Sequence, residues 1–240
     1  MTNNIYTLLT EYRLGEAIEA LQSKVESIRD VSVTGQFYTL LDNYRAYIRV
    51  QMQQLSTCSP AETEPFYRQA YSVNDRANRR IRLFKAPNDQ YSLAVNSADG
   101  MFERIWTSDL WDDKEKADID SFAGLCPERM PVVVSAVTLA LCEMFDEKKL
   151  MYLFDAYEHP DQVVSLRALI GLIIILRRYD SRIVHYPQIA SRLSLLSERP
   201  SFVRQFFNAH VILQYSRMTE SVSDKMRNDI IPILIKRTRG

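Results

Sequence analysis

The amino-acid sequence predicts an all-α protein, built as an α-solenoid-like stack of antiparallel helical hairpins. Apolar side chains recur at helical spacing along most of the chain. The 240 residues include only 6 Gly and 9 Pro, too few for many tight β-turns. Residues 168–176 carry no charge. A helix that is apolar on nearly every side must be covered on nearly every side, and its neighbours in sequence are the natural cover.

Composition narrows the class of protein. The charges of thirty acidic and thirty basic side chains cancel. A net charge of zero argues against general electrostatic binding to nucleic acid or to an anionic membrane. Cys58, Cys126 and Cys142 have neither CxxC nor Cys/His ligand spacing, so we expect a reducing compartment and no zinc site. The uncharged stretches 130–142 and 168–176 are shorter than the roughly 20 residues of a membrane span. The N-terminus has no signal-peptide pattern. These features predict a soluble, cytoplasmic protein without a cofactor.

The N-terminal part is expected to form a helical bundle, and we assign it to a domain of residues 1–95. Helices are predicted over residues 5–29, 34–55 and 61–84 from their apolar periodicity. Gly15 interrupts the first of these and is interpreted as a turn between two short helices.

A loop at residues 86–90 and a brief alternating stretch at 91–95 separate this bundle from the second predicted domain, residues 96–240. That domain opens with two helices, one ending near Trp106 and one beginning near Asp112.

The remaining sequence is more regular. Its predicted helices cover residues 130–145, 147–158, 160–179, 186–197, 201–218 and 221–235. Short connections, among them Asp180-Ser181 and Thr219-Glu220, favour antiparallel neighbours that bury their faces by stacking. The last helix is apolar although the chain ends soon after it. We therefore expect further residues of a longer protein, or self-association through this C-terminal helix, to cover it.

Two stretches resemble known helical-repeat families. Tyr12-Arg13-Leu14-Gly15-Glu16-Ala17-Ile18 resembles the hinge of a tetratricopeptide repeat. The second stretch has Leu150-x-x-Leu153-Phe154, then His159-Pro160-Asp161-x-x-Val164, then Ala168 and Leu172, and it resembles a HEAT repeat. HEAT repeats usually place Arg directly after the Val, whereas this chain has Ser165 there and Arg167 two positions on. The whole chain resembles the N-terminal part of an uncharacterised bacterial helical-repeat protein, which implies a HEAT/TPR-like superhelix, protein binding and scaffolding.

The sequence offers no recognisable catalytic or metal-binding motif. His159, His185 and His210 share no i, i+4 spacing, and no phosphate loop, GxSxG or HExxH is present. We therefore predict that the protein is not an enzyme.

Candidate partner-binding residues fall into two groups. The first is a basic cluster: Arg76, Arg79, Arg80, Arg82 and Lys85, which Arg177, Arg178 and Arg182 extend if the two parts of the chain pack together. Such a cluster beside aromatic residues can bind a phosphate backbone or an acidic protein. The alternative interpretation is purely structural: the basic side chains lie on a solvated helix face and pair with the acidic run at residues 109–120. The second group is Trp106 and Trp111. Their side chains either contact a partner at the surface or pack in the core at a junction between helical units.

We predict a non-enzymatic helical-repeat scaffold that mediates protein–protein interaction. The alternatives are a HEAT-like nucleic-acid-binding protein, in the manner of the HEAT-like DNA glycosylases, and a structural self-assembly module. The identity of the protein partner does not follow from the sequence.

Overall fold

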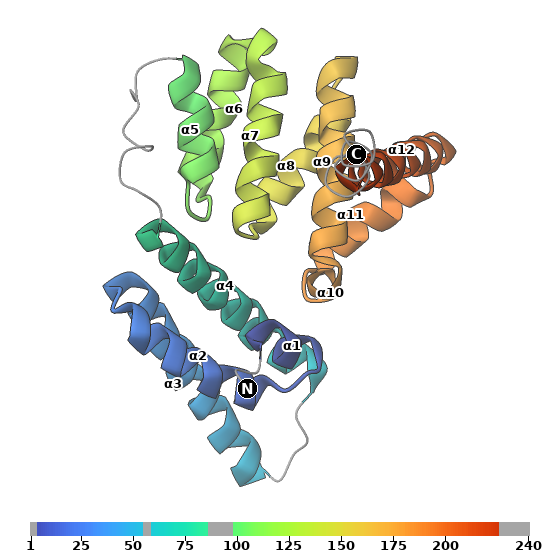
Figure 1. Ribbon diagram of the computed structural model, residues 1–240. Helices are drawn as coiled ribbons and strands as arrows, with labels where there is room; N and C mark the ends of the chain where they lie inside the picture. Colours follow the sequence, from blue (N-terminus) through green and yellow to red (C-terminus); the bar gives the residue numbers. More distant parts are fainter. Residues whose placement is uncertain (1–3, 55–58, 86–97, 226–240) are drawn as a thin grey trace, which may run out of the picture. The chain divides into compact units, whose positions relative to one another are not determined.

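The computed structural model describes residues 4–54, 59–85 and 98–225, and every secondary-structure element in these ranges is helical (Figure 1). The elements are α1 (Ile5–Thr10), α2 (Leu14–Ile28), α3 (Val31–Gln54), α4 (Pro60–Lys85), α5 (Ala98–Thr107), α6 (Asp113–Leu125), the 3₁₀ turn η2 (Pro127–Arg129), α7 (Met130–Glu143), α8 (Glu147–Tyr157), α9 (Gln162–Arg178), α10 (Asp180–Ile183), α11 (Pro187–Ser197) and α12 (Pro200–Lys225). The all-α prediction is confirmed.

The chain divides into two compact units, Met1–Ala190 and Ser191–Gly240. The predicted domain boundary after residue 95 lies outside the described residues, as do the loop at 86–90, the stretch at 91–95 and Cys58. The boundary stays a prediction, although the first compact unit contains helices from both sides of it.

Helices α1 to α4 form the N-terminal part of the first unit. The helix α4 packs against α1, α2 and α3 (Figure 1). Their shared core includes the buried side chains of Leu9, Leu21, Phe37, Leu40 and Tyr71. Burial of large apolar side chains such as these contributes about 1.5–3 kcal/mol each, so this core holds the four helices together.

The first helix break lies before Gly15, not at it. Tyr12 adopts a left-handed conformation with φ 60°, and Gly15 lies inside α2. The Tyr12 N–H donates to the Leu9 carbonyl at 3.3 Å, and the Arg13 N–H donates to the Leu8 carbonyl at 2.9 Å. This pair of hydrogen bonds is a Schellman motif, which ends a helix at a left-handed residue.

Helices α7, α8 and α9 pack closely on one another. Asp161 is the N-cap of α9, because its carboxylate accepts hydrogen bonds from the Val163 and Val164 amides at 2.7 and 3.3 Å. Asp146 caps α8 in the same way. Gly171 permits the close approach: a Cβ placed on it would overlap Thr138 Oγ1 of α7 and lie 3.3 Å from Leu153 Cδ1 of α8.

We expect Gly171→Ala to destabilise the wild-type protein by about 1–3 kcal/mol, because the methyl group overpacks the contact with Thr138. In a Thr138→Ala background the same change should be neutral or stabilising by up to about 1 kcal/mol, since Ala favours helix over Gly. Urea denaturation of the four proteins in this double-mutant cycle measures the coupling. Equal effects of Gly171→Ala in both backgrounds would contradict the packing argument.

Two predicted turns differ in the structure. Asp180-Ser181 begins the short helix α10, and Thr219-Glu220 lies within α12, which is continuous to Lys225. The Thr219 hydroxyl donates to the Tyr215 carbonyl at 2.9 Å, so this side chain is accommodated inside the helix. Within the second unit, Phe202 is buried and its ring lies 5.5 Å from that of Phe206. The predicted helix over residues 221–235 lies largely outside the described residues.

Candidate functional site

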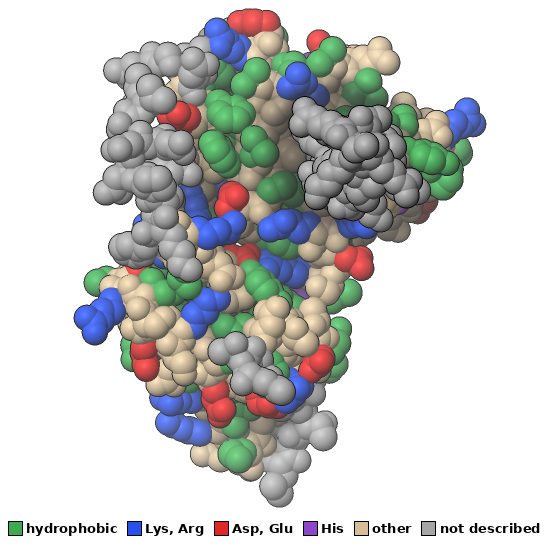
Figure 2. All heavy atoms as spheres, viewed as in Figure 1, with side chains coloured by type: hydrophobic (Ala, Val, Ile, Leu, Met, Phe, Trp, Pro, Cys, Tyr) green, Lys and Arg blue, Asp and Glu red, His purple; other side chains and the backbone are tan. Residues whose placement is uncertain are grey.

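The arginines of the predicted basic cluster are distributed around α4 and are mostly paired with carboxylates. Salt bridges join Arg79 to Asp109 at 2.9 Å, Arg80 to Asp30 at 3.2 Å, and Arg82 to Glu143 at 2.6 Å. Figure 2 shows basic and acidic side chains interspersed where α4 faces α5 and α7. The pairing neutralises much of the charge that a phosphate backbone would need, and favours the interpretation as a paired helix face.

The other predicted basic residues lie apart from these three. Arg76 is half-buried beside Val31 and Leu110, and Arg177 is exposed at the end of α9. The side chain of Lys85 lies outside the described residues. The structure therefore brings only part of the predicted cluster together.

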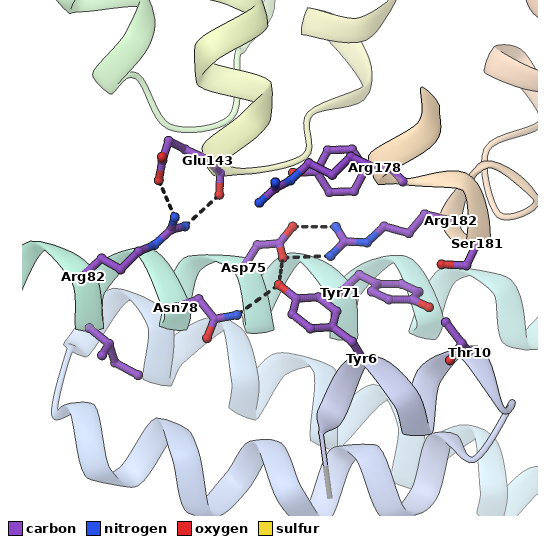
Figure 3. Close-up of a pocket in the computed structure, with 12 residues that line it drawn as sticks. Tyr6, Thr10, Tyr71, Asp75, Asn78, Arg82, Glu143, Arg178, Ser181 and Arg182 are labelled. Atoms are coloured by element: carbon purple, nitrogen blue, oxygen red, sulfur yellow. Dashed lines mark hydrogen bonds and ion pairs between the residues drawn. The ribbon is translucent and has the colours of Figure 1, made fainter. Parts of the chain in front are cut away.

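One cavity does unite Arg82 with Arg178 and Arg182, as the sequence suggested if the two parts of the chain packed together (Figure 3). It has a volume of about 470 Å³ and is lined by residues of α1, α4, α7, α9 and α10. We call it the Asp75 cavity, because the buried carboxylate of Asp75 on α4 faces Arg182 of α10 in its wall.

Asp75 and Arg182 form a bidentate ion pair, with N–O distances of 2.5 and 2.9 Å. The Tyr6 hydroxyl also donates to Asp75, at 2.5 Å, and the Phe145 amide donates to it at 3.4 Å. The Asn78 amide donates to the Tyr6 oxygen at 3.0 Å. The carboxylate is therefore saturated by partners from α1, the α7–α8 connection and α10.

Aromatic rings surround the guanidinium of Arg182. Its central carbon lies 4.4 Å from the ring centre of Tyr71, 4.7 Å from that of Tyr179 and 5.1 Å from that of Tyr6. Arginine stacks favourably on such faces. The pair and its rings clasp the N-terminal helices to α10, and we call this group the Asp75–Arg182 clasp.

The electrostatics of the clasp oppose an acid–base role near neutral pH. Burial and the neighbouring carboxylate of Asp75 raise the pKa of Tyr6 above its ordinary value. Burial acts to lower the pKa of Arg182, but the hydrogen bonds and charge of Asp75 outweigh it and raise that pKa. Both groups keep their protons at pH 7, so the arrangement is that of a structural ion pair.

Asp75 was missed at the sequence level. A signal was present, because Tyr71, Asp75 and Asn78 recur at i, i+4 and i+7 and so share one side of α4. Their common partner, Arg182, lies 107 positions away from Asp75.

The two tryptophans have different surroundings. Trp111 is only 4% exposed, so its side chain lies in the core and not on a partner surface. Its backbone N–H donates to Asp146 at 2.7 Å and its ring meets Tyr152 edge-on at 5.7 Å, as expected for a residue that plugs a junction. Trp106 is half-buried beside Phe102, with ring centres 6.0 Å apart.

Lys149 is a buried cation that the sequence did not reveal. It is 1% exposed, and its ammonium donates to the backbone carbonyls of Ser108 and Asp109 at 3.2 and 2.7 Å. The carboxylate of Asp146 lies 3.9 Å away and the ring of Trp111 5.6 Å away. Burial lowers the pKa of Lys149 to about 8, although Asp146 opposes the shift.

An exposed group of aliphatic side chains lies on α7 and α9. We call it the α7–α9 apolar patch, and its members are Val132, Leu139, Val163, Leu166 and Ile170. Arg167 connects the two helices by donating to Ser135 Oγ at 2.8 Å and to the Pro131 carbonyl at 3.3 Å. Side chains three or four positions apart on a helix are neighbours, so Val163, Leu166 and Ile170 adjoin one another along α9, and Val132 and Leu139 lie on either side of Ser135 on α7. Figure 2 shows hydrophobic side chains at the surface over α5 and α7.

Within the described ranges, no group of three or more His, Cys, Asp or Glu side chains is placed to hold a metal ion. Among the same residues, no single helix has the length and apolar character to cross a membrane, although one bent pair, Asp113–Gly124 with Pro127–Glu143, meets these two criteria together. Comparison of the chain with protein-family models, with curated proteins and with solved structures found no significant match.

Proposed function

We propose that the protein is a non-enzymatic helical-repeat scaffold of the HEAT/tetratricopeptide kind, which binds another protein in the cytoplasm. The observation that carries this proposal is the α7–α9 apolar patch. Five large aliphatic side chains remain exposed on two adjoining helices whose opposite faces are fully packed. Exposed apolar side chains gathered on adjoining helices mark sites of protein association, because covering them is favourable by about 25 cal/mol per Å².

The α8–α9 hairpin supports the repeat interpretation. Asp161 caps α9 at the turn, and the small residues Ala168 and Gly171 face its neighbours. Arg167 takes a different role from the Arg that follows Val in HEAT repeats, because it binds α7 through Ser135 and Pro131. In a stack of hairpins this contact would fix the register between successive repeats.

A nucleic-acid-binding role finds less support. Three of the arginines proposed to hold phosphates are paired with Asp109, Asp30 and Glu143. Each pair would have to break before a phosphate could replace the carboxylate, so binding at low salt would be weak.

The test is capture of the partner by the intact chain from the cells that produce it. We expect Leu166→Glu to reduce the amount of captured partner at least tenfold, because a charge at the centre of the patch must be desolvated on binding. The matched control is Val50→Glu, an exposed valine on α3 outside the patch. Thermal denaturation should show that both variants fold.

Equal capture by Leu166→Glu and by the wild-type chain would contradict this role for the patch. Sedimentation at several concentrations gives a second readout. If the wild-type chain forms a dimer that Leu166→Glu abolishes, the partner is a second copy of the chain. The self-assembly alternative would then replace the proposal that the patch binds a different protein. A dimer that only α12 variants such as Phe207→Glu abolish would place self-association at the exposed face of that helix.

A further inference from the structure

A second cavity, of about 860 Å³, lies within the first compact unit and is lined by aromatic rings. Its wall comprises the α1–α2 connection, parts of α2, α3 and α4, and the segment that follows α10. The rings are those of Tyr12, Tyr44, Tyr47, Tyr67 and His185, and we call this the tyrosine cavity. Its volume is within the range of cavities that bury a ligand of several hundred daltons.

Tyr12 is held in an unfavourable backbone conformation at the rim of this cavity. It is the left-handed residue of the Schellman motif that ends α1, with φ 60°. Glycine usually takes that position, because any side chain raises the energy of a left-handed residue. Yet the Tyr12 side chain is 66% exposed, so little burial compensates for the strain. Strained residues of this kind cluster at binding sites.

The rings form an ordered wall. Tyr67 and His185 stack with their centres 5.0 Å apart and their planes 5° from parallel. Tyr12 meets both edge-on, at 5.8 Å from Tyr67 and 6.3 Å from His185. Burial lowers the pKa of His185, so this imidazole is neutral at pH 7 and adds no positive charge to the wall.

The charges around the cavity are mainly negative. Glu16 and Glu64 line it, and Glu62 lies at its edge, where it accepts a hydrogen bond from the Tyr47 hydroxyl at 3.1 Å. Arg13 also lines the cavity, but it is neutralised by Glu11 and Glu16 at 3.0 and 2.6 Å. Arg68 pairs with Glu64. The charged side chains that line the cavity are therefore two carboxylates and one guanidinium group, and the ring faces add further negative potential.

We propose that the tyrosine cavity binds a positively charged side chain, arginine or lysine, of an extended peptide segment. Aromatic faces and carboxylates together are the chemistry that recognises such a cation. The inference rests on the proposed protein-binding function and specifies the partner's chemistry at a second site. The ring of Tyr12 lies against the bound cation, because its strained backbone holds the ring in place before the peptide arrives.

The test uses a fluorescently labelled peptide of glycine and serine with three arginines, and the same peptide with citrulline in their place. Fluorescence anisotropy should show that the wild-type chain binds the arginine peptide at least tenfold more tightly. Tyr12→Gly should weaken that binding at least tenfold while the melting temperature stays the same or rises, because glycine relieves the backbone strain. Tyr12→Phe keeps the ring and should bind within threefold of wild type.

Absence of binding to the arginine peptide would overturn this inference. Equal binding of the citrulline peptide, or of a proline-rich peptide without charge, would overturn it as well. So would a fall in the melting temperature of Tyr12→Gly with unchanged binding. The Leu166→Glu variant separates the two proposals. It should bind the arginine peptide as the wild type does, so a failure of the α7–α9 apolar patch and a failure of the tyrosine cavity are recognised independently.

Discussion

Asp75→Ala is expected to lower the free energy of unfolding by about 3–5 kcal/mol, the usual effect of removing one partner from a buried ion pair. The change leaves the guanidinium of Arg182 buried among aromatic rings without a counter-charge. It also removes the acceptor of the Tyr6 hydroxyl and of the Phe145 amide. Urea denaturation followed by circular dichroism measures the loss, with an unchanged slope as the check on two-state unfolding.

A surface pair supplies the control. Arg104 and Asp118 lie 3.2 Å apart with both side chains about half exposed, so Asp118→Ala should cost no more than about 1 kcal/mol. A double variant, Asp75→Leu with Arg182→Met, should recover most of the stability lost in Asp75→Ala, since an apolar pair leaves no buried charge. A loss below about 1 kcal/mol for Asp75→Ala would show that the clasp does not hold these helices together.

The clasp also bears on the proposed peptide site. Arg182 lies three residues before His185, and His185 stacks on Tyr67 of the same α4 that carries Asp75. The ion pair therefore fixes the segment that forms one wall of the tyrosine cavity. Asp75→Ala should weaken arginine-peptide binding as well as stability, in contrast to Tyr12→Gly, which separates the two effects.

The helices of this protein were largely predictable, because local signals specify them. The sequence predicted helices over 61–84 and 160–179, and the structure has α4 and α9 there. The first helix break was misplaced because Gly15 is the stronger breaker by residue type. The actual break depends on a tyrosine in a glycine-like conformation, which local propensity disfavours.

The candidate site was predictable only in part. The basic residues of α4 were identified, and Asp109 belongs to the acidic run named as their partner, but Asp30 and Glu143 come from segments that no sequence spacing indicates. Lys149 follows Asp146, Glu147 and Lys148, a charged run that the local sequence alone would place at the surface. Nothing in the local sequence shows that its ammonium reaches two carbonyls about 40 positions away.

The difference in free energy of unfolding between the wild-type protein and Lys149→Met should change with pH. We expect the wild-type protein to gain stability relative to Lys149→Met between about pH 8 and pH 10.5. The pKa of Lys149 is about 8 in the folded protein, against 10.5 for an unburied lysine. In this interval the unfolded chain holds the proton and the folded chain has released it, so the free energy of unfolding increases with pH. The increase can reach about 3 kcal/mol, from 1.36 kcal/mol per pKa unit. Urea denaturation of both proteins across this pH range measures it.

Other titratable groups also contribute to the pH dependence of the free energy of unfolding, so the contribution of Lys149 has to be separated from theirs. Asp146, Glu115 and Asp109 favour the charged lysine and Arg79 opposes it, but burial outweighs them. Buried tyrosines alter stability above pH 10 in both proteins alike, so the difference between the two curves isolates the lysine. The adjacent Lys148 is half-exposed and its salt bridge with Asp113 raises its pKa, so Lys148→Met should leave the difference from wild type constant over this range. Parallel curves for wild type and Lys149→Met would mean that the ammonium stays charged in the folded protein.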